Sequence, residues 1–163
     1  MESSATFLHD IARPLFLLHT AAGVALAGLC LHVLLTARKI VLGRPGRVEL
    51  VRKFVGWAFL ATLAVIVLGF LIYPEYKANV RVAFINRHAP SVGRLFDIKE
   101  YFAVFTLPLC AFLFAARKDF GPKAGRELRY LYGAALLLWT LAVWATAVIG
   151  WYTTTVRPVG GAP

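Results

Sequence analysis

The chain has 163 residues, of which 60% are hydrophobic and 16% are charged, and its formal net charge is +10. A soluble domain has about 45–50% apolar and about 25% charged residues, so this chain has more apolar surface than one core of its size can bury. The composition argues against a water-soluble protein and predicts contact with a lipid bilayer. The length predicts a single domain over residues 1–163.

Four apolar stretches follow one another along the chain and are separated by charged segments. They cover residues 14–36, 54–73, 98–116 and 130–151, and each is close to the roughly 20 residues that a helix needs to cross a bilayer. A short amphipathic segment over residues 5–13 precedes the first stretch and is too short to cross. The predicted fold is therefore an all-α integral membrane protein, a four-transmembrane-helix bundle.

The distribution of basic residues predicts how this bundle is oriented. The connections before the second and fourth stretches are strongly basic; they hold Arg38, Lys39, Arg44, Arg47, Arg52, Lys53, Arg117, Lys118, Lys123, Arg126 and Arg129. Because basic connections tend to stay in the cytoplasm, we expect a multi-pass protein of the inner (cytoplasmic) membrane with both termini outside. The second connection is also basic, although alternation places it outside.

That second connection, residues 74–97, is predicted to be a longer external loop between the second and third transmembrane helices. It has about two dozen residues, whereas connections in helix bundles usually have about 2–8. Its mixture of apolar and basic residues fits a helix lying on the membrane surface that only orients the bundle. A docking surface for a partner, or a lid over a site in the outer leaflet, is the alternative.

Other features exclude several classes of function. Cys30 and Cys110 lie in apolar stretches and outside any Cys-x-x-Cys pattern, so neither a disulfide framework nor covalent haem attachment is predicted. No phosphate-binding loop, Gly-x-Ser-x-Gly elbow or His-Glu-x-x-His motif is present. Aromatic and basic residues are not interleaved, so we expect lipid and other membrane subunits as partners, and no nucleic acid.

Two histidines, His19 and His32, lie within the first apolar stretch. Ionisable residues inside a membrane span are costly and therefore mark candidate functional sites. The two positions fall in opposite leaflets, which resembles the layout of di-haem b-type cytochromes, in which imidazoles bind haem iron between helices. Thirteen residues at about 100° each separate the two side chains by about 140°, which argues against two haems stacked in one groove.

A low-spin b-type haem usually needs a second axial ligand, and the other three stretches contain neither His nor Met. His88, in the second connection, and His9, before the first stretch, are the candidates to pair with His19 at one haem near the outer face. His32 then has no partner in its own chain. The alternative for both membrane histidines is a structural imidazole that bonds to a neighbouring helix.

Small residues follow both faces of the first stretch. Ala21, Ala25 and Gly28 share the face of His32, whereas Gly23 and Ala27 share the face of His19. They leave room beside each imidazole, and they equally suit close packing of helices.

Asp97 and Glu100 begin the third stretch at a spacing that places both on one helix face. Acidic residues in the first turn of a helix favour its dipole, which is the simplest interpretation. The alternative groups them with His9, His19 and His88 at one membrane face, as a proton relay at a quinone site or as a metal site.

The expected function is a membrane-anchored electron-transfer subunit, a b-type cytochrome with haem b bound by His19 and His32, which exchanges electrons with quinone or a redox partner. The first alternative is a non-catalytic subunit that serves assembly of a larger membrane complex. The second is a small transporter, although paired repeats and interrupted helices are not evident. The sequence leaves open whether the chain is an enzyme.

Overall fold

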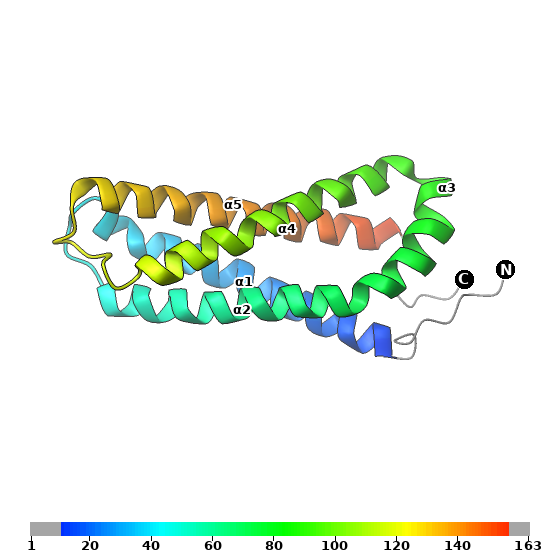
Figure 1. Cartoon of the computed structure of the whole chain (residues 1–163), viewed down its shortest axis with the longest axis horizontal. Coiled ribbons are helices and arrows are strands. Elements are labelled where there is room, and N and C mark those ends of the chain that lie inside the picture. Colours follow the sequence, from blue (N-terminus) through cyan, green and yellow to red (C-terminus); the bar gives the residue numbers. More distant parts are fainter. Residues whose placement is uncertain (1–10, 157–163) are drawn as a thin grey trace.

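The computed structural model describes residues 11–156 and forms an antiparallel four-helix bundle (Figure 1). Its long helices are α1 (Ala12–Val41), α2 (Val48–Glu75), α4 (Pro90–Ala116) and α5 (Arg126–Val156). Each helix packs against two others, since α1 contacts α2 and α5, and α4 contacts the same two helices. All four are long and apolar enough to cross a membrane. The predicted all-α four-helix membrane bundle is confirmed.

The helices extend well beyond the predicted apolar stretches. Helix α1 has 30 residues, which corresponds to about 45 Å at about 1.5 Å per residue, whereas the hydrocarbon core of a bilayer is about 30 Å thick. The excess turns carry six of the eleven basic residues of the two basic connections, and the other five lie in the turns between the helices: Arg44, Arg47, Arg117, Lys118 and Lys123.

The connection over residues 74–97 differs from the predicted loop because it is helical at every residue except Ala89. Helix α2 continues through Pro74 into the π-helix η2 (Tyr76–Ile85) and the short α3 (Asn86–His88). Pro90 then opens α4, and a proline disfavours helical geometry in the residue before it, which explains the break at Ala89 (φ −147°, ψ 61°). In Figure 1 this segment arches from α2 to α4 over one end of the bundle, which we call the arch end.

The opposite end, which we call the basic end, carries the turns between α1 and α2 and between α4 and α5 (Figure 1). Gly43 has φ +73° just after α1, a left-handed conformation that glycine adopts without a Cβ clash. Arg52 of α2 binds the other turn: its guanidinium donates to the carbonyl oxygens of Arg117 at 3.0 Å and Lys118 at 2.5 Å. These bonds satisfy carbonyls that the end of α4 leaves without intrahelical partners.

The interior has two separate apolar cores. One fills the middle and the basic end and includes Cys30, Val55, Leu113, Tyr132 and Trp139. The other lies beneath the arch; it comprises Ala12, Ile72, Tyr76, Val80, Ile85, Val92 and Phe96. Along each long helix, the residues between these two cores belong to neither of them, and the polar side chains described next begin there.

Candidate functional site

His19 of α1 lies between the two apolar cores and is held by α2. Its Nδ1 atom is 3.0 Å from the carbonyl oxygen of Val65. Because a carbonyl oxygen only accepts, Nδ1 carries the proton in this bond, and in a neutral imidazole Nε2 keeps its lone pair for another partner. A Cβ atom at Gly69 would lie 3.3 Å from His19 Cε1, so the glycine provides the space that the ring occupies.

Lys99 of α4 faces the same part of the bundle. Its Nζ atom would lie 3.5 Å from a Cβ atom on Gly150 of α5, and it lies 4.9 Å from the centre of the Phe96 ring. Its charged neighbours are His19 and Glu100. Within residues 11–156, no carboxylate oxygen is within ion-pair distance of this ammonium group.

Glu75 is the last residue of α2 and is only 1% exposed. The side-chain amide of Asn79, one turn further along, donates to Glu75 Oε1 at 2.8 Å. A carboxyl group buried at this depth in a membrane bundle is unfavourable unless polar partners surround it. Glu75 therefore marks this end of the bundle as a polar site within an apolar setting.

Tyr76 follows Glu75 and is also buried. Its ring stacks on that of Phe96 with the centroids 4.1 Å apart. The hydroxyl group is enclosed and has no hydrogen-bond partner in the part of the chain that the structure describes. A buried hydroxyl without a partner normally costs about 1–3 kcal/mol, so its position favours a ligand that supplies the missing bond.

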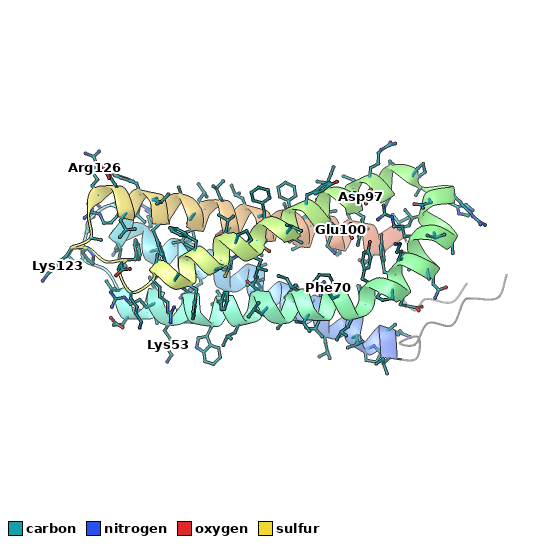
Figure 2. The ribbon with its side chains drawn as sticks, viewed as in Figure 1. Lys53, Phe70, Asp97, Glu100, Lys123 and Arg126 are labelled. Atoms are coloured by element: carbon teal, nitrogen blue, oxygen red, sulfur yellow. The ribbon has the colours of Figure 1, made fainter. Side chains whose placement is uncertain are left out.

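Arg81 and Asp97 join the arch to α4. The guanidinium Nη2 of Arg81 donates to Asp97 Oδ1 at 2.6 Å, and both are charged neighbours of the Tyr76 hydroxyl. Figure 2 shows Asp97 and Glu100 one turn apart on α4, on the part of the helix that adjoins the arch. We refer to His19, Glu75, Tyr76 and Lys99, which are buried or partly buried polar residues toward the arch end, as the polar cluster; the Arg81–Asp97 pair lies at the same end.

The structure places two of the histidine candidates, His32 and His88, at exposed positions. His88 is exposed in α3, where its ring stacks on Phe84 and its Nδ1 is 3.0 Å from the Phe84 carbonyl oxygen. His32 is exposed on α1 and meets only the edge of Phe54, at 4.8 Å between ring centres. His9 lies outside the described residues.

The acidic candidates have local partners or neighbours instead. Asp97 is paired with Arg81, and Glu100 is half-buried beside Lys99. Within residues 11–156 no three His, Cys, Asp or Glu side chains gather as metal ligands do. The roles assigned to these histidines and acids stay predictions.

Sequence reasoning missed Glu75 and Lys99 as members of the cluster. Glu75 and Tyr76 lie just after the second predicted stretch, and Lys99 is the second residue of the third, so none of these positions stands out in the sequence as part of a site. In the structure α2 passes into the arch at Glu75 and Tyr76, and the arch leads to α4, which carries Lys99 toward the same end of the bundle.

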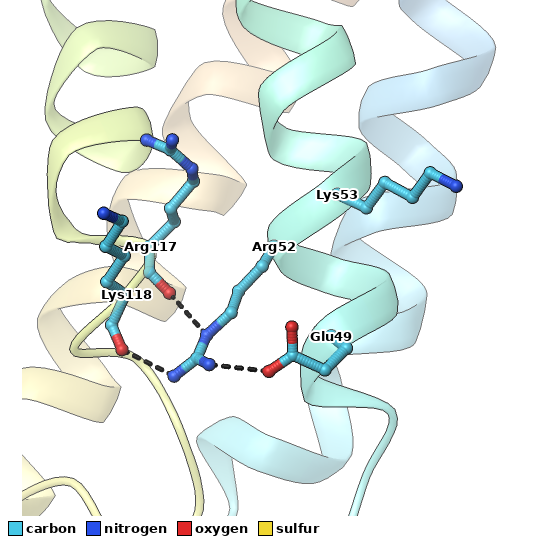
Figure 3. Close-up of a pocket in the computed structure, with 5 residues that line it drawn as sticks. All are labelled: Glu49, Arg52, Lys53, Arg117 and Lys118. Atoms are coloured by element: carbon cyan, nitrogen blue, oxygen red, sulfur yellow. Dashed lines mark hydrogen bonds and ion pairs between the residues drawn. The ribbon is translucent and has the colours of Figure 1, made fainter.

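A second feature is an open hollow of about 590 Å³ between α2 and α4 at the basic end (Figure 3). Its lining consists of Glu49, Arg52, Lys53, Arg117 and Lys118. It belongs to neither the polar cluster nor the apolar cores.

Comparison with protein-family models, with curated proteins and with solved structures finds no match.

Proposed function

We propose that this chain is a membrane-anchored electron-transfer subunit whose polar cluster binds the head group of a quinone. The observation that supports this proposal is the burial of ionisable and polar side chains with unused bonding capacity: Tyr76 has an enclosed hydroxyl without a partner, and Lys99 has no carboxylate partner within residues 11–156. A purely structural bundle gains nothing from such residues, because burying them is unfavourable.

The chemistry of a quinone matches this set of side chains. The two carbonyl oxygens of a quinone accept hydrogen bonds, and the Tyr76 hydroxyl and the Lys99 ammonium group donate them. Reduction to the quinol takes up two electrons and two protons, and oxidation releases them. His19 and Glu75 are groups that exchange protons, whereas the electrons come from or go to a redox partner.

The spacing between α2 and α4 changes along the bundle. Figure 1 shows α4 diverging from α2 toward the arch end, and Figure 2 draws Phe70 between the two ribbons. The side chain of Phe70, on α2, is 74% exposed. We propose that a quinone enters from the bilayer between α2 and α4.

A second role that we propose for His19 is to bind haem b. A histidine that binds a metal usually donates its other ring nitrogen to a carboxylate or a carbonyl, as His19 Nδ1 does to Val65. His19 would therefore fit as one axial ligand through Nε2. The exposed positions of His32 and His88 give it no second ligand from those residues, so that ligand would come from His9, which lies outside the described residues, or from a neighbouring subunit.

An assembly role is the competing function, and one observation favours it. The small residues Ala21, Ala25 and Gly28 are exposed along α1, on the face that His32 shares. Exposed small residues let a second helix approach closely in a membrane. Electron-transfer subunits also assemble with partners, so this face suits both functions.

The orientation proposed with this function places the basic end in the cytoplasm and the arch end outside, in the inner membrane. In the described residues the basic end carries most of the Lys and Arg side chains, while the acidic residues are divided equally between the two ends. The polar cluster would then lie in the outer leaflet.

Titration of the purified protein with a short-chain quinone analogue tests the proposal. We expect saturable binding that falls about tenfold in Tyr76→Phe, because one hydrogen bond of about 1.4 kcal/mol is lost, and further in Lys99→Met. Tyr130→Phe, on an exposed position of α5, is the matched control. Equal binding by wild type and both cluster variants would reject the quinone site.

A reduced-minus-oxidised absorption spectrum of the same sample distinguishes the haem arrangement. A Soret band that disappears in His19→Ala and persists in His32→Ala assigns a haem ligand to His19. A colourless protein that binds quinone supports the quinone site without haem. A colourless protein that binds no quinone leaves assembly as the better function.

A further inference from the structure

We propose that the hollow between α2 and α4 at the basic end binds the phosphate of an anionic phospholipid. This inference does not depend on the quinone site, which lies at the other end of the bundle. It rests on unpaired cations around one hollow, on the direction of their side chains and on the apolar surface that begins beside them.

The charges in the hollow do not cancel. Glu49 accepts a hydrogen bond from Arg52 Nη1 at 2.7 Å, while the Nε and Nη2 atoms of Arg52 donate to carbonyl oxygens of the turn after α4. Arg52 is therefore occupied with structural bonds (Figure 3). Arg117 Nη1 also donates to the Phe114 carbonyl oxygen, but within residues 11–156 none of Lys53, Arg117 and Lys118 has a carboxylate partner.

Two of these cations point in one direction. In Figure 3 the side chains of Arg117 and Lys118 run side by side, parallel to α4, while Lys53 extends from α2 away from them and borders the hollow with its stem. The guanidinium of Arg117 lies 3.5 Å from the centre of the Phe114 ring, which holds it against the helix. A guanidinium and an ammonium group held together form a suitable binding site for a phosphate.

The position of the hollow favours a lipid over a free anion. It lies where α2 and α4 leave the predicted membrane spans, at the depth of lipid head groups. Trp57 follows Lys53 by one turn and is 56% exposed, and Leu60 continues the same exposed face. Tryptophan is enriched at the membrane interface, and the apolar face beyond it suits an acyl chain. Basic pockets between transmembrane helices on the cytoplasmic side are typical sites for acidic head groups.

Native mass spectrometry of the full-length protein in detergent tests this site, with phosphatidylglycerol or phosphatidylcholine as the added lipid. The variant Lys53→Gln/Arg117→Gln/Lys118→Gln removes the three cations. The control Arg44→Gln/Lys123→Gln/Arg126→Gln removes the same charge at the same end but outside the hollow. Circular dichroism and the melting temperature establish that each variant folds, and the single variant Lys118→Gln replaces the triple one if it does not.

We expect wild type to prefer phosphatidylglycerol and the hollow variant to bind it about 25-fold more weakly, since Arg117 and Lys118 each contribute about a fivefold factor and Lys53 extends away from them. Lys118→Gln alone should lose about fivefold, and the control variant should retain binding. Equal losses in the two triple variants would overturn the site, because they would indicate diffuse attraction. Equal binding of the two lipids would overturn it as well, as would inorganic phosphate that binds the hollow when the lipid does not.

Discussion

Single residues decide the geometry around His19, and Gly69 is the one that can be tested without removing the histidine. A methyl group at this position would lie 3.3 Å from His19 Cε1, closer than an ordinary contact. Gly69→Ala should therefore displace the imidazole from the Val65 carbonyl. The helix gains up to about 1 kcal/mol from replacing glycine, which offsets the crowding.

We accordingly expect Gly69→Ala to leave the melting temperature nearly unchanged and to weaken quinone-analogue binding about tenfold. Gly56→Ala on the same helix meets nothing within 4 Å and is the control for both measurements. If Gly69→Ala binds the analogue like wild type, the position of His19 is irrelevant to the ligand.

Arg52 provides a second test at the residue scale, because one guanidinium connects α2 to the turn after α4. Charged hydrogen bonds of this kind contribute about 1.5–3 kcal/mol, so Arg52→Ala should lower the free energy of unfolding by about 2 kcal/mol. Arg44→Ala, an exposed arginine at the same end, should change it by less than about 0.5 kcal/mol. Chemical denaturation in lipid-free detergent compares the two, and equal effects would mean that the turn holds without Arg52.

At the scale of elements, the packing of α5 on α1 depends on Gly133. A Cβ atom there would lie 2.9 Å from Val41 Cγ1, too close without a shift of one helix. Gly133→Ala should therefore destabilise the bundle by about 1–3 kcal/mol, although alanine favours the helix. Gly23→Ala has open space and should be neutral or stabilising. Thermal unfolding of both variants measures this, and a stabilised Gly133→Ala would contradict the close approach.

The four long helices could be predicted from sequence because about 20 apolar residues in a row have few other stable arrangements. The mixed pattern of apolar and basic residues in the arch favours a helix on the membrane surface, but it does not show that this helix continues α2 and folds over the end of the bundle. The break in the helix at Ala89 is predictable from the sequence, because Pro90 disfavours helical geometry in the residue before it. The sequence assigns no role to Lys99 or Glu75, because their burial depends on the helices that pack around them.

The histidines illustrate a different limit of sequence reasoning. The prediction that His19 and His32 point in different directions agrees with the structure, where one ring contacts α2 through Val65 and the other is exposed. Helical periodicity sets this angle within one helix. It does not say which direction faces another helix and which faces lipid, so the contact of His19 with α2 could not be predicted from the sequence.

At the scale of the whole molecule, the orientation in the membrane is a prediction of its own. Cysteines placed at the two ends, Ser91→Cys at the arch end and Lys123→Cys at the basic end, occupy exposed positions, whereas Cys30 and Cys110 are buried. A membrane-impermeant maleimide should label Ser91→Cys in intact cells and Lys123→Cys only after permeabilisation. The reverse labelling pattern would mean that the bundle has the opposite orientation in the membrane.

Photolabelling with an azidoquinone tests most directly whether the polar cluster is a quinone site. The purified wild-type protein is irradiated with and without an excess of unlabelled quinone, and the modified peptides are mapped by mass spectrometry. We expect the labels to fall in residues 65–80 of α2 and η2 and in residues 96–103 of α4. An excess of unlabelled quinone should remove them. Labels spread along the exposed faces of all four helices, or labels that competition does not reduce, would contradict it.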